Sequence, residues 1–119
     1  MMMRAARGAI RISEDTKDAV LDGTERLLRE MLERNGLGPE NLVSVFFTAT
    51  DDLTSVFPAE AARRIGLSAV PLLCAREMAV RDAMPSVIRV LMHFHSDRAL
   101  SEVEHVYQDG AQALRDDLA

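Results

Sequence analysis

The chain has 119 residues, of which 48% are hydrophobic and 28% are charged, and its formal net charge is −5. This length and composition fit one globular domain, residues 1–119, and exclude a disordered chain. The acidic balance argues against general nucleic-acid binding, which needs a basic surface to displace counterions. Aromatic residues are only 4%, so the core is built from aliphatic side chains and Met. A core this small favours help from further subunits.

Cysteine use and the N-terminal residues bear on the compartment. Cys74 is the only cysteine, so no disulfide can form within the chain. Arg4 and Arg7 come before any long apolar stretch, which is unlike a signal peptide. No segment approaches the ~18 uncharged apolar residues of a membrane span. We therefore expect a cytoplasmic protein.

The first third of the chain predicts a strand followed by a helix. Residues Ala5–Ile12 alternate in character and indicate a strand, in which Gly8 permits a close approach or a bulge. Cap candidates and acids over Ser13–Asp18 then begin an amphipathic helix, whose apolar stripe runs from Val20 to Leu32. The pair Asn35-Gly36 is typical of a helix C-terminus.

The middle of the chain predicts two buried strands around a short helix. Leu42–Ala49 is β-branched, aromatic and nearly all apolar, which favours a buried strand. Pro58 begins a short helix that runs through Ile65 and ends at Gly66. Val70–Cys74 is the next predicted strand.

The last third contains the most regular strand of the sequence, Val87–His95. One face carries Ile88, Val90, Met92 and Phe94, and the other carries Val87, Arg89, Leu91, His93 and His95. After it, Ala99–Tyr107 is compatible with a helical turn, and Gly110–Leu114 favours helix or loop by propensity. Strands that alternate with helices and end on a late strand indicate an α/β or α+β fold.

Several kinds of reactive site have only weak support. The sequence has no GxSxG elbow and no glycine-rich phosphate loop. His93 and His95 share a strand face, but only His105 remains as a third imidazole, so we expect no metal site. Cys74 ends an apolar strand, where a small buried hydrophobe is the common case and a soft pocket contact is the alternative.

Arg89 is the most unusual charged residue, because it stands in the middle of an apolar strand. An unpaired buried charge is costly, so Arg89 faces either water or a pocket or subunit interface where an anion or a Glu satisfies it. Glu77 has Arg76 and Arg81 nearby in sequence, and a solvated ion pair is its simplest interpretation. From the residues alone the chain is a small α/β domain with a possible anion pocket.

Taken together, several stretches resemble the small, homotrimeric α/β-barrel class of monofunctional chorismate mutases. The resemblance runs from Arg4 to Leu118, and its strength lies in the order and spacing of the stretches. They are residues 4–9 (RAARGA), 48–53 (TATDDL), 56–59 (VFPA), 70–78 (VPLLCAREM), 88–92 (IRVLM), 105–107 (HVY) and 114–118 (LRDDL).

The resemblance implies a reaction and an architecture. The reaction is the pericyclic rearrangement of chorismate to prephenate, in phenylalanine and tyrosine biosynthesis, without cofactor, metal or covalent intermediate. Catalysis then depends on conformer restriction and electrostatic preorganisation. The implied fold is a mixed sheet with helices on one face. Three subunits pack as a pseudo-barrel with active sites in clefts between neighbours, and Gly110–Leu114 is implied to be a strand.

The resemblance also implies roles for individual residues. Arg89 resembles the central catalytic cation at the ether oxygen, where negative charge grows in the transition state. Glu77 and Cys74 match residues that contact the ring hydroxyl, and Glu77 also faces the developing positive charge of the ring. The substrate-binding positions that remain are Arg7 and Tyr107 for the side-chain carboxylate, Phe57 and Leu114 as apolar walls, Arg63 and Arg115 as mobile cations, and Leu73.

Departures from the family pattern and two other functions stay open at this point. Position 60, often basic in the class, is Glu60 here, and Asp116 stands where Pro is usual, so weaker substrate capture and a looser tail are expected. Residues 83–86 also differ. The alternatives are an enamine or imine deaminase of similar trimeric fold, and a non-catalytic anion-binding assembly domain.

Overall fold

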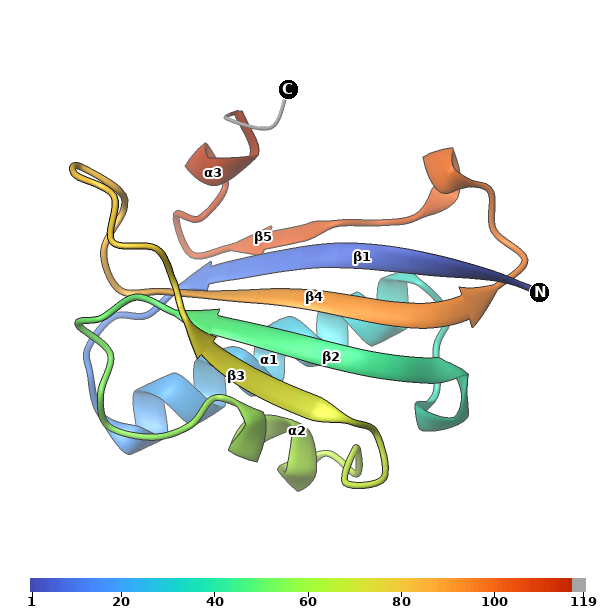
Figure 1. Ribbon diagram of the computed structural model, residues 1–119, viewed down its shortest axis with the longest axis horizontal. Helices are drawn as coiled ribbons and strands as arrows, with labels where there is room; N and C mark the ends of the chain where they lie inside the picture. The colour runs from blue at the N-terminus through green and yellow to red at the C-terminus, as the bar shows by residue number, and fades with distance from the viewer. Residues whose placement is uncertain (117–119) are drawn as a thin grey trace.

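Five strands form one mixed β-sheet in the order β3-β2-β4-β1-β5 (Figure 1). The structure is a computed structural model that describes residues 1–116. The central strand β4 (Val87–Ser96) pairs antiparallel with β1 (Met2–Arg11) and with β2 (Leu42–Ala49). The edge strands β3 (Leu72–Arg76) and β5 (Val106–Gln108) pair in parallel with β2 and β1. The expected mixed sheet of an α+β fold is confirmed.

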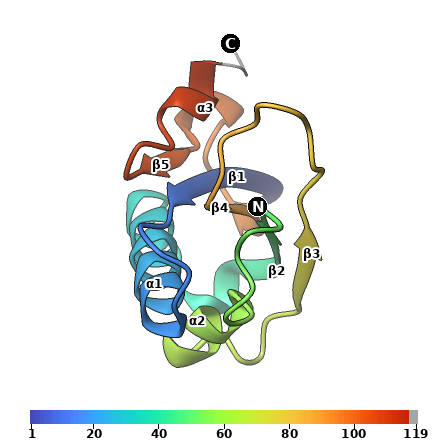
Figure 2. The same cartoon turned by 90° about the vertical axis from the view of Figure 1, so that its left-hand side faces the viewer.

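Two helices, α1 (Lys17–Arg34) and α2 (Ala59–Arg64), cover the same face of the sheet (Figure 2). Helix α1 begins where the capping residues predict, because the Thr16 side chain accepts a hydrogen bond from the Ala19 backbone N–H. It buries the predicted apolar stripe against the sheet. No helix within residues 1–116 is long and apolar enough to span a membrane.

The two faces of β4 have the different characters that the sequence predicts. On the helix side, Ile88, Val90, Met92 and Phe94 are each at most 3% exposed and belong to the main core. On the opposite side, which we call the open face, Arg89, Leu91 and His93 are only half-buried. The open face is therefore the part of the sheet with side chains available to a ligand or to another subunit.

Gly8 allows a close approach where β1 crosses α1. A Cβ atom at this position would lie 2.4 Å from Sδ of Met31 and 3.3 Å from Cδ1 of Leu27. Real Cβ atoms do not come this close to a neighbour, so the glycine lets the strand and the helix pack without a gap. Of the two interpretations of Gly8, the close approach is confirmed.

The expected strand at Gly110–Leu114 is wrong. Strand β5 ends at Gln108, and the next two residues have φ values of 54° and 92°. The Ala111 and Leu114 N–H groups then donate to the carbonyls three residues earlier, at 3.0 and 2.9 Å. These local bonds replace pairing with the sheet and lead into α3 (Ala113–Asp116). The propensity of this segment for helix or loop is the stronger effect.

Other boundaries move by a few residues. Strand β1 starts at Met2 rather than Ala5, because its first residues pair with the end of β4. The edge strand β3 starts at Leu72 rather than Val70 and ends at Arg76, with the Pro71 carbonyl accepting a bond from Val45 N–H. Short 3₁₀ turns occupy Pro39–Asn41 (η1) and Leu100–Glu102 (η2). The second turn lies within the predicted helical turn at Ala99–Tyr107.

Candidate active site

Arg89 lies on the open face and is paired with Glu77. Its Nε atom is 2.7 Å from Oε1 of Glu77, and the two side chains are 40% and 13% exposed. Although the charges are close, the Nε–H has no aligned acceptor among the described residues. The contact is a charge pair without a good hydrogen bond. Glu77 thus pairs with Arg89, not with its sequence neighbours Arg76 or Arg81.

Glu77 is held by the end of β2 at two points. Its backbone N–H donates to the Ala49 carbonyl at 2.9 Å, and its Oε1 accepts a hydrogen bond from the Thr48 hydroxyl at 3.1 Å. Thr48 stands directly opposite Arg89 in the β2–β4 register. The sequence interpretation gave Thr48 no role. Its position on the open face of a strand is a signal, but only the sheet register places it beside both charged residues.

The open face contains a hollow of about 520 Å³ that brings several predicted residues together. Arg7 enters it from β1, Leu73 from β3, Arg89 from β4 and Tyr107 from β5. Register explains the gathering, because Arg89 and Tyr107 both stand opposite Ala9 on neighbouring strands. Directly paired residues share a face of a sheet, so three strands present these groups to the same side.

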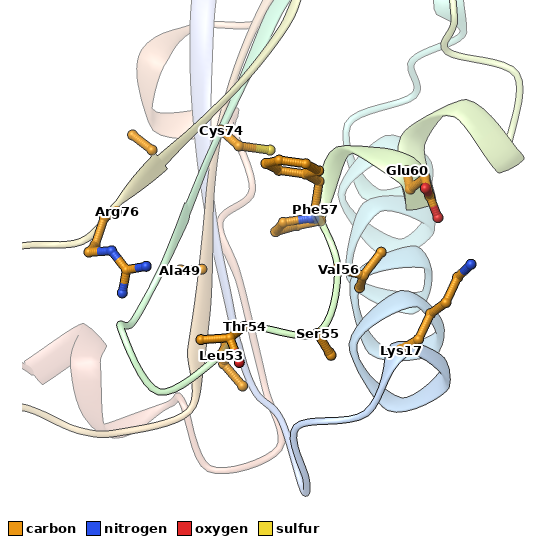
Figure 3. Close-up of a pocket in the computed structure, with 12 residues that line it drawn as sticks. Lys17, Ala49, Leu53, Thr54, Ser55, Val56, Phe57, Glu60, Cys74 and Arg76 are labelled. Atoms are coloured by element: carbon orange, nitrogen blue, oxygen red, sulfur yellow. The ribbon is translucent and has the colours of Figure 1, made fainter.

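A second hollow, of about 630 Å³, lies beyond the edge strand β3 (Figure 3). It contains Phe57 and Cys74, together with Lys17 and Glu60, which stand on the helix side. The Phe57 ring and the Cys74 thiol point toward one another (Figure 3). Phe57 is 73% exposed, which is unusual for a large aromatic side chain. Of the predicted substrate-binding residues, Phe57 and Cys74 therefore line this second hollow, whereas Arg7, Leu73 and Tyr107 line the open-face hollow.

The environment of Cys74 favours a neutral thiol. Burial raises the pKa of Cys74 above its ordinary value, while a hydrogen bond from the Ala59 backbone N–H and the charge of Arg63 lower it by less. A thiol with a raised pKa is a poor nucleophile at neutral pH. Arg63 itself is exposed, on the last turn of α2 near this thiol.

Leu114, a C-terminal candidate, does not line either hollow. Leu114 is 6% exposed and packs with Ala9, Val87 and Ala111 in a small second core on the open face, at one end of the sheet. The Arg115 side chain lies outside what the structure describes.

Strand β5, which carries Tyr107, is tied to α1 by polar side chains. Buried Asn35 donates to the Glu104 carbonyl at 3.0 Å and accepts from the Glu104 N–H at 2.9 Å. Beyond the strand, Arg26 binds both carboxylate oxygens of Asp109, at 3.2 and 2.9 Å. Because the strand has only three residues, these bonds on either side of it fix where Tyr107 meets the hollow.

The start of β4 is fastened by the loop that follows β2. The Asp52 carboxylate accepts bonds from the Ser86 backbone N–H and hydroxyl and from the Thr50 hydroxyl, and these bonds lower the pKa of Asp52. Thr50 Oγ1 also accepts from the Val87 N–H at 3.0 Å. The loop thus fixes the strand two residues before Arg89.

His93 is engaged in contacts within its own face. Its Nδ1 is 3.2 Å from the Ser44 hydroxyl oxygen, and its ring meets Phe46 edge-on with centroids 5.6 Å apart. Within residues 1–116, no group of three or more His, Cys, Asp or Glu side chains is placed to hold a metal ion.

Comparisons with known proteins identify the family of this chain. The family model described as chorismate mutase type I matches residues 3–118. The chain belongs to this family. It is 52% identical over 118 residues to the chorismate mutase AroH of Thermus thermophilus, covering 98% of this chain and 97% of that protein. It is 38% identical over 120 residues to the AroH of Bacillus subtilis strain 168, covering 100% and 94%.

A solved structure extends the similarity to the fold. The chorismate mutase of Clostridium thermocellum superposes with a TM-score of 0.91 at 40% identity, covering 92% of this chain and 98% of that one. The predicted resemblance is confirmed, and with it chorismate mutase function, which is an isomerisation. The deaminase and the non-catalytic assembly domain are not favoured.

Proposed function

We propose that this chain rearranges chorismate to prephenate in sites shared between neighbouring subunits of a homotrimer, with Arg89 and Glu77 as catalytic residues. The observation that carries the proposal is the Arg89–Glu77 pair on the open face, beside a hollow that also receives Arg7 and Tyr107. Two cations, one carboxylate and one phenol suit a dianionic substrate that develops separated charge as it reacts.

Arg89 has the properties that the rearrangement demands of its central cation. The ether C–O bond breaks while a C–C bond forms, and negative charge grows on the ether oxygen. A guanidinium fixed on a central strand meets that charge without reorganising, and the interaction is stronger in the transition state than in the ground state. Its Nε–H is buried beside Glu77, but the side chain as a whole is 40% exposed, so part of it remains accessible to a substrate.

The other residues are assigned by charge and position. Arg7 and Tyr107, both at the open-face hollow, would bind the side-chain carboxylate, since Arg donates a planar fork that matches it. Glu77 would contact the ring hydroxyl and the developing positive charge of the ring. Arg63 is exposed, which suits attraction of the dianion. Arg115 keeps the same proposed role.

The edge strand β3 supplies the reason for proposing a shared site. Successive residues of a strand point to opposite sides, so Leu73 reaches the open-face hollow while Cys74 reaches the second one. Within one chain the two side chains therefore face different hollows. A neighbour that presents its Phe57 and Cys74 to the open-face hollow would complete the site and cover the exposed Phe57 and Leu73, which are 73% and 59% exposed.

The direct test of the reaction is the loss of chorismate absorbance with purified protein and no added cofactor. Saturable turnover to prephenate is the expected result, and its absence with folded protein would exclude the function.

Sharing of the site is tested by mixing two variants that are impaired in different halves of the site. Arg89→Ala removes the open-face half of the site, and Arg63→Ala weakens the other half. Co-refolded mixtures should regain activity, because some sites then combine two intact halves. If each site lies within one chain, mixing restores nothing. Wild-type chain refolded alone is the control for recovery.

The proposal also includes a single domain, a cytoplasmic location and a reaction without a cofactor. We assign the activity to one domain, residues 1–119, acting in the cytoplasm. A single cysteine and an isomerisation that needs no redox partner are consistent with that location. The rearrangement requires no cofactor, because no proton, hydride or electron leaves the substrate.

A further inference from the structure

We infer that Thr48 is a positioning residue. It holds the Glu77 carboxylate beside Arg89 and prevents the two side chains from forming a bidentate ion pair. The inference rests on the proposed function, because it names the residue that sets the geometry of the two catalytic groups. Thr48 is half-buried, lines the open-face hollow and stands directly opposite Arg89 in the sheet.

One carboxylate oxygen receives both contacts. Oε1 of Glu77 accepts the Thr48 hydroxyl at 3.1 Å and lies 2.7 Å from Arg89 Nε. The hydroxyl bond is aligned, whereas the Arg89 contact is not. Arginine–carboxylate pairs frequently adopt the bidentate arrangement, with two parallel N–H···O bonds. The Thr48 bond opposes that arrangement by fixing the position of the shared oxygen.

The backbone makes the restraint effective. Glu77 is anchored by its N–H to the Ala49 carbonyl at 2.9 Å, one residue along from Thr48. Both the main chain and the side chain of Glu77 are therefore hydrogen-bonded to the end of β2. Arg89 is positioned relative to the same residues, because Thr48 pairs with it across the β2–β4 ladder. The separation of the two charged groups follows from one short segment of one strand.

Loss of the Thr48 hydroxyl would change the hydrogen bonds of the Arg89 guanidinium. If the hydroxyl is lost, Glu77 can swing into a bidentate pair and occupy the N–H groups that Arg89 would give to the ether oxygen. The substrate must then displace an internal carboxylate, and the preorganised field at the ether oxygen weakens. Thr48 acts through Glu77 and Arg89, which makes it a positioning residue in this proposal.

The test compares two substitutions at the same site. Thr48→Val keeps the shape and removes the hydroxyl, and Thr48→Ser keeps the hydroxyl. We expect Thr48→Val to lower kcat on the order of 10- to 100-fold, the range for a hydrogen bond to a charged group. Thr48→Ser should stay within about threefold of wild type, since it retains that bond. Assays are run well below the unfolding temperature of each variant, so that all variants are folded.

A matched control is available in α1. Thr24 is fully buried, and its hydroxyl has no hydrogen-bond partner in the described residues. Thr24→Val makes the same chemical change away from the site, and it should leave kcat and KM unchanged. A loss in Thr24→Val as large as that in Thr48→Val would mean that hydroxyl removal acts through general packing, and would overturn the inference.

A second readout does not depend on turnover. The ¹⁵N resonance of Arg89 Nε, assigned by its disappearance in Arg89→Lys, reports how the guanidinium is hydrogen-bonded. It should shift in Thr48→Val and remain in place in Thr48→Ser. An unmoved resonance in Thr48→Val, or equal kinetic loss in both Thr48 variants, contradicts the inference. If the wild type does not convert chorismate, the proposed function fails, and the resonance alone still decides the role of Thr48.

Discussion

Arg89 and Glu77 lie 12 residues apart in sequence, yet their side chains approach to 2.7 Å on the open face of the sheet. The loop between β3 and β4 leaves the sheet after Glu77 and returns to it at Ser86, where Asp52 receives it. Arg89 thereby gains an acidic neighbour that lowers the cost of placing a charge on a central strand.

The first prediction concerns the charge of Arg89. Arg89→Ala should lower kcat by at least about 10²–10³-fold, because loss of even one preorganised donor to a developing oxyanion has this effect. Arg89→Lys should also fail badly, since a flexible ammonium cannot reproduce the planar fork. Circular dichroism and light scattering on each variant check that the fold and the assembly are intact.

A citrulline at position 89 separates charge from hydrogen bonding in the same experiment. It keeps a similar shape while removing the positive charge. If the field of the cation carries catalysis, citrulline should bind substrate and lose most of the rate. Near-normal turnover would instead show that positioning is sufficient.

The second prediction concerns assembly. The chain should be a homotrimer in solution, because the open face and the edge beyond β3 leave large apolar side chains uncovered. Leu73→Asp should weaken the trimer and lower activity with it, while Leu100→Asp, at a still more exposed position outside both hollows, should not. Multi-angle light scattering at micromolar concentration is the measurement, and a wild-type monomer would exclude the shared site.

The third prediction concerns metals. Turnover should be unchanged by EDTA, since the proposed reaction uses orientation and charge supplied by the chain itself. The assay is repeated after dialysis against the chelator and again after adding back Mg²⁺ and Zn²⁺. Recovery of lost activity on adding either metal would count decisively against the proposed mechanism.

The fourth prediction concerns acid stability. Hydrogen bonds from Thr54 and Ser55 lower the pKa of Asp15. Hydrogen bonds from Thr50 and Ser86 lower the pKa of Asp52. A hydrogen bond from Arg26 and its charge lower the pKa of Asp109. A carboxyl with a lowered folded-state pKa contributes stability above its unfolded pKa, and this is lost as pH falls through the folded value. The contribution of these carboxyl groups to the free energy of unfolding should therefore vary little from neutral pH to about pH 5. It should decrease as the pH falls below about 4.

Urea unfolding across this pH range checks the prediction residue by residue. Asp52→Asn should flatten the acid limb, because one carboxyl with a lowered pKa has been removed. Asp51→Asn is the control, because it removes a carboxylate from the same turn and leaves the Asp52 bonds to Ser86 in place. A wild-type chain that becomes more stable between pH 5 and 3 would contradict the assignment.

The fifth prediction concerns the crossing of β1 and α1. Gly8→Ala should destabilise the fold by about 1–3 kcal/mol, because the new methyl group meets Met31 Sδ. Met31→Ala makes room, so the double variant should be less destabilised than the sum of the two single changes. Thermal unfolding measures all three variants. Strict additivity would show that this contact does not set the packing.

The sequence by itself determined the family and most of the elements. The alternation of Val87–His95, the caps and stripe of α1 and the apolar run of β2 each express a local periodicity, which is why their ends were predicted within a few residues. Arg89 could be singled out because a charge within an apolar strand conflicts with that periodicity.

Only the tertiary structure decided which residues meet. The pairing of Glu77 with Arg89, and the place of Thr48 between them, depend on strand register, which joins segments far apart in the chain. The end of β5 is instead a local effect, because positive φ angles and turn bonds after Gln108 agree with the propensity of that segment for helix or loop. Leu73 and Cys74 are neighbours in sequence but face different hollows, because successive side chains of a strand point to opposite sides.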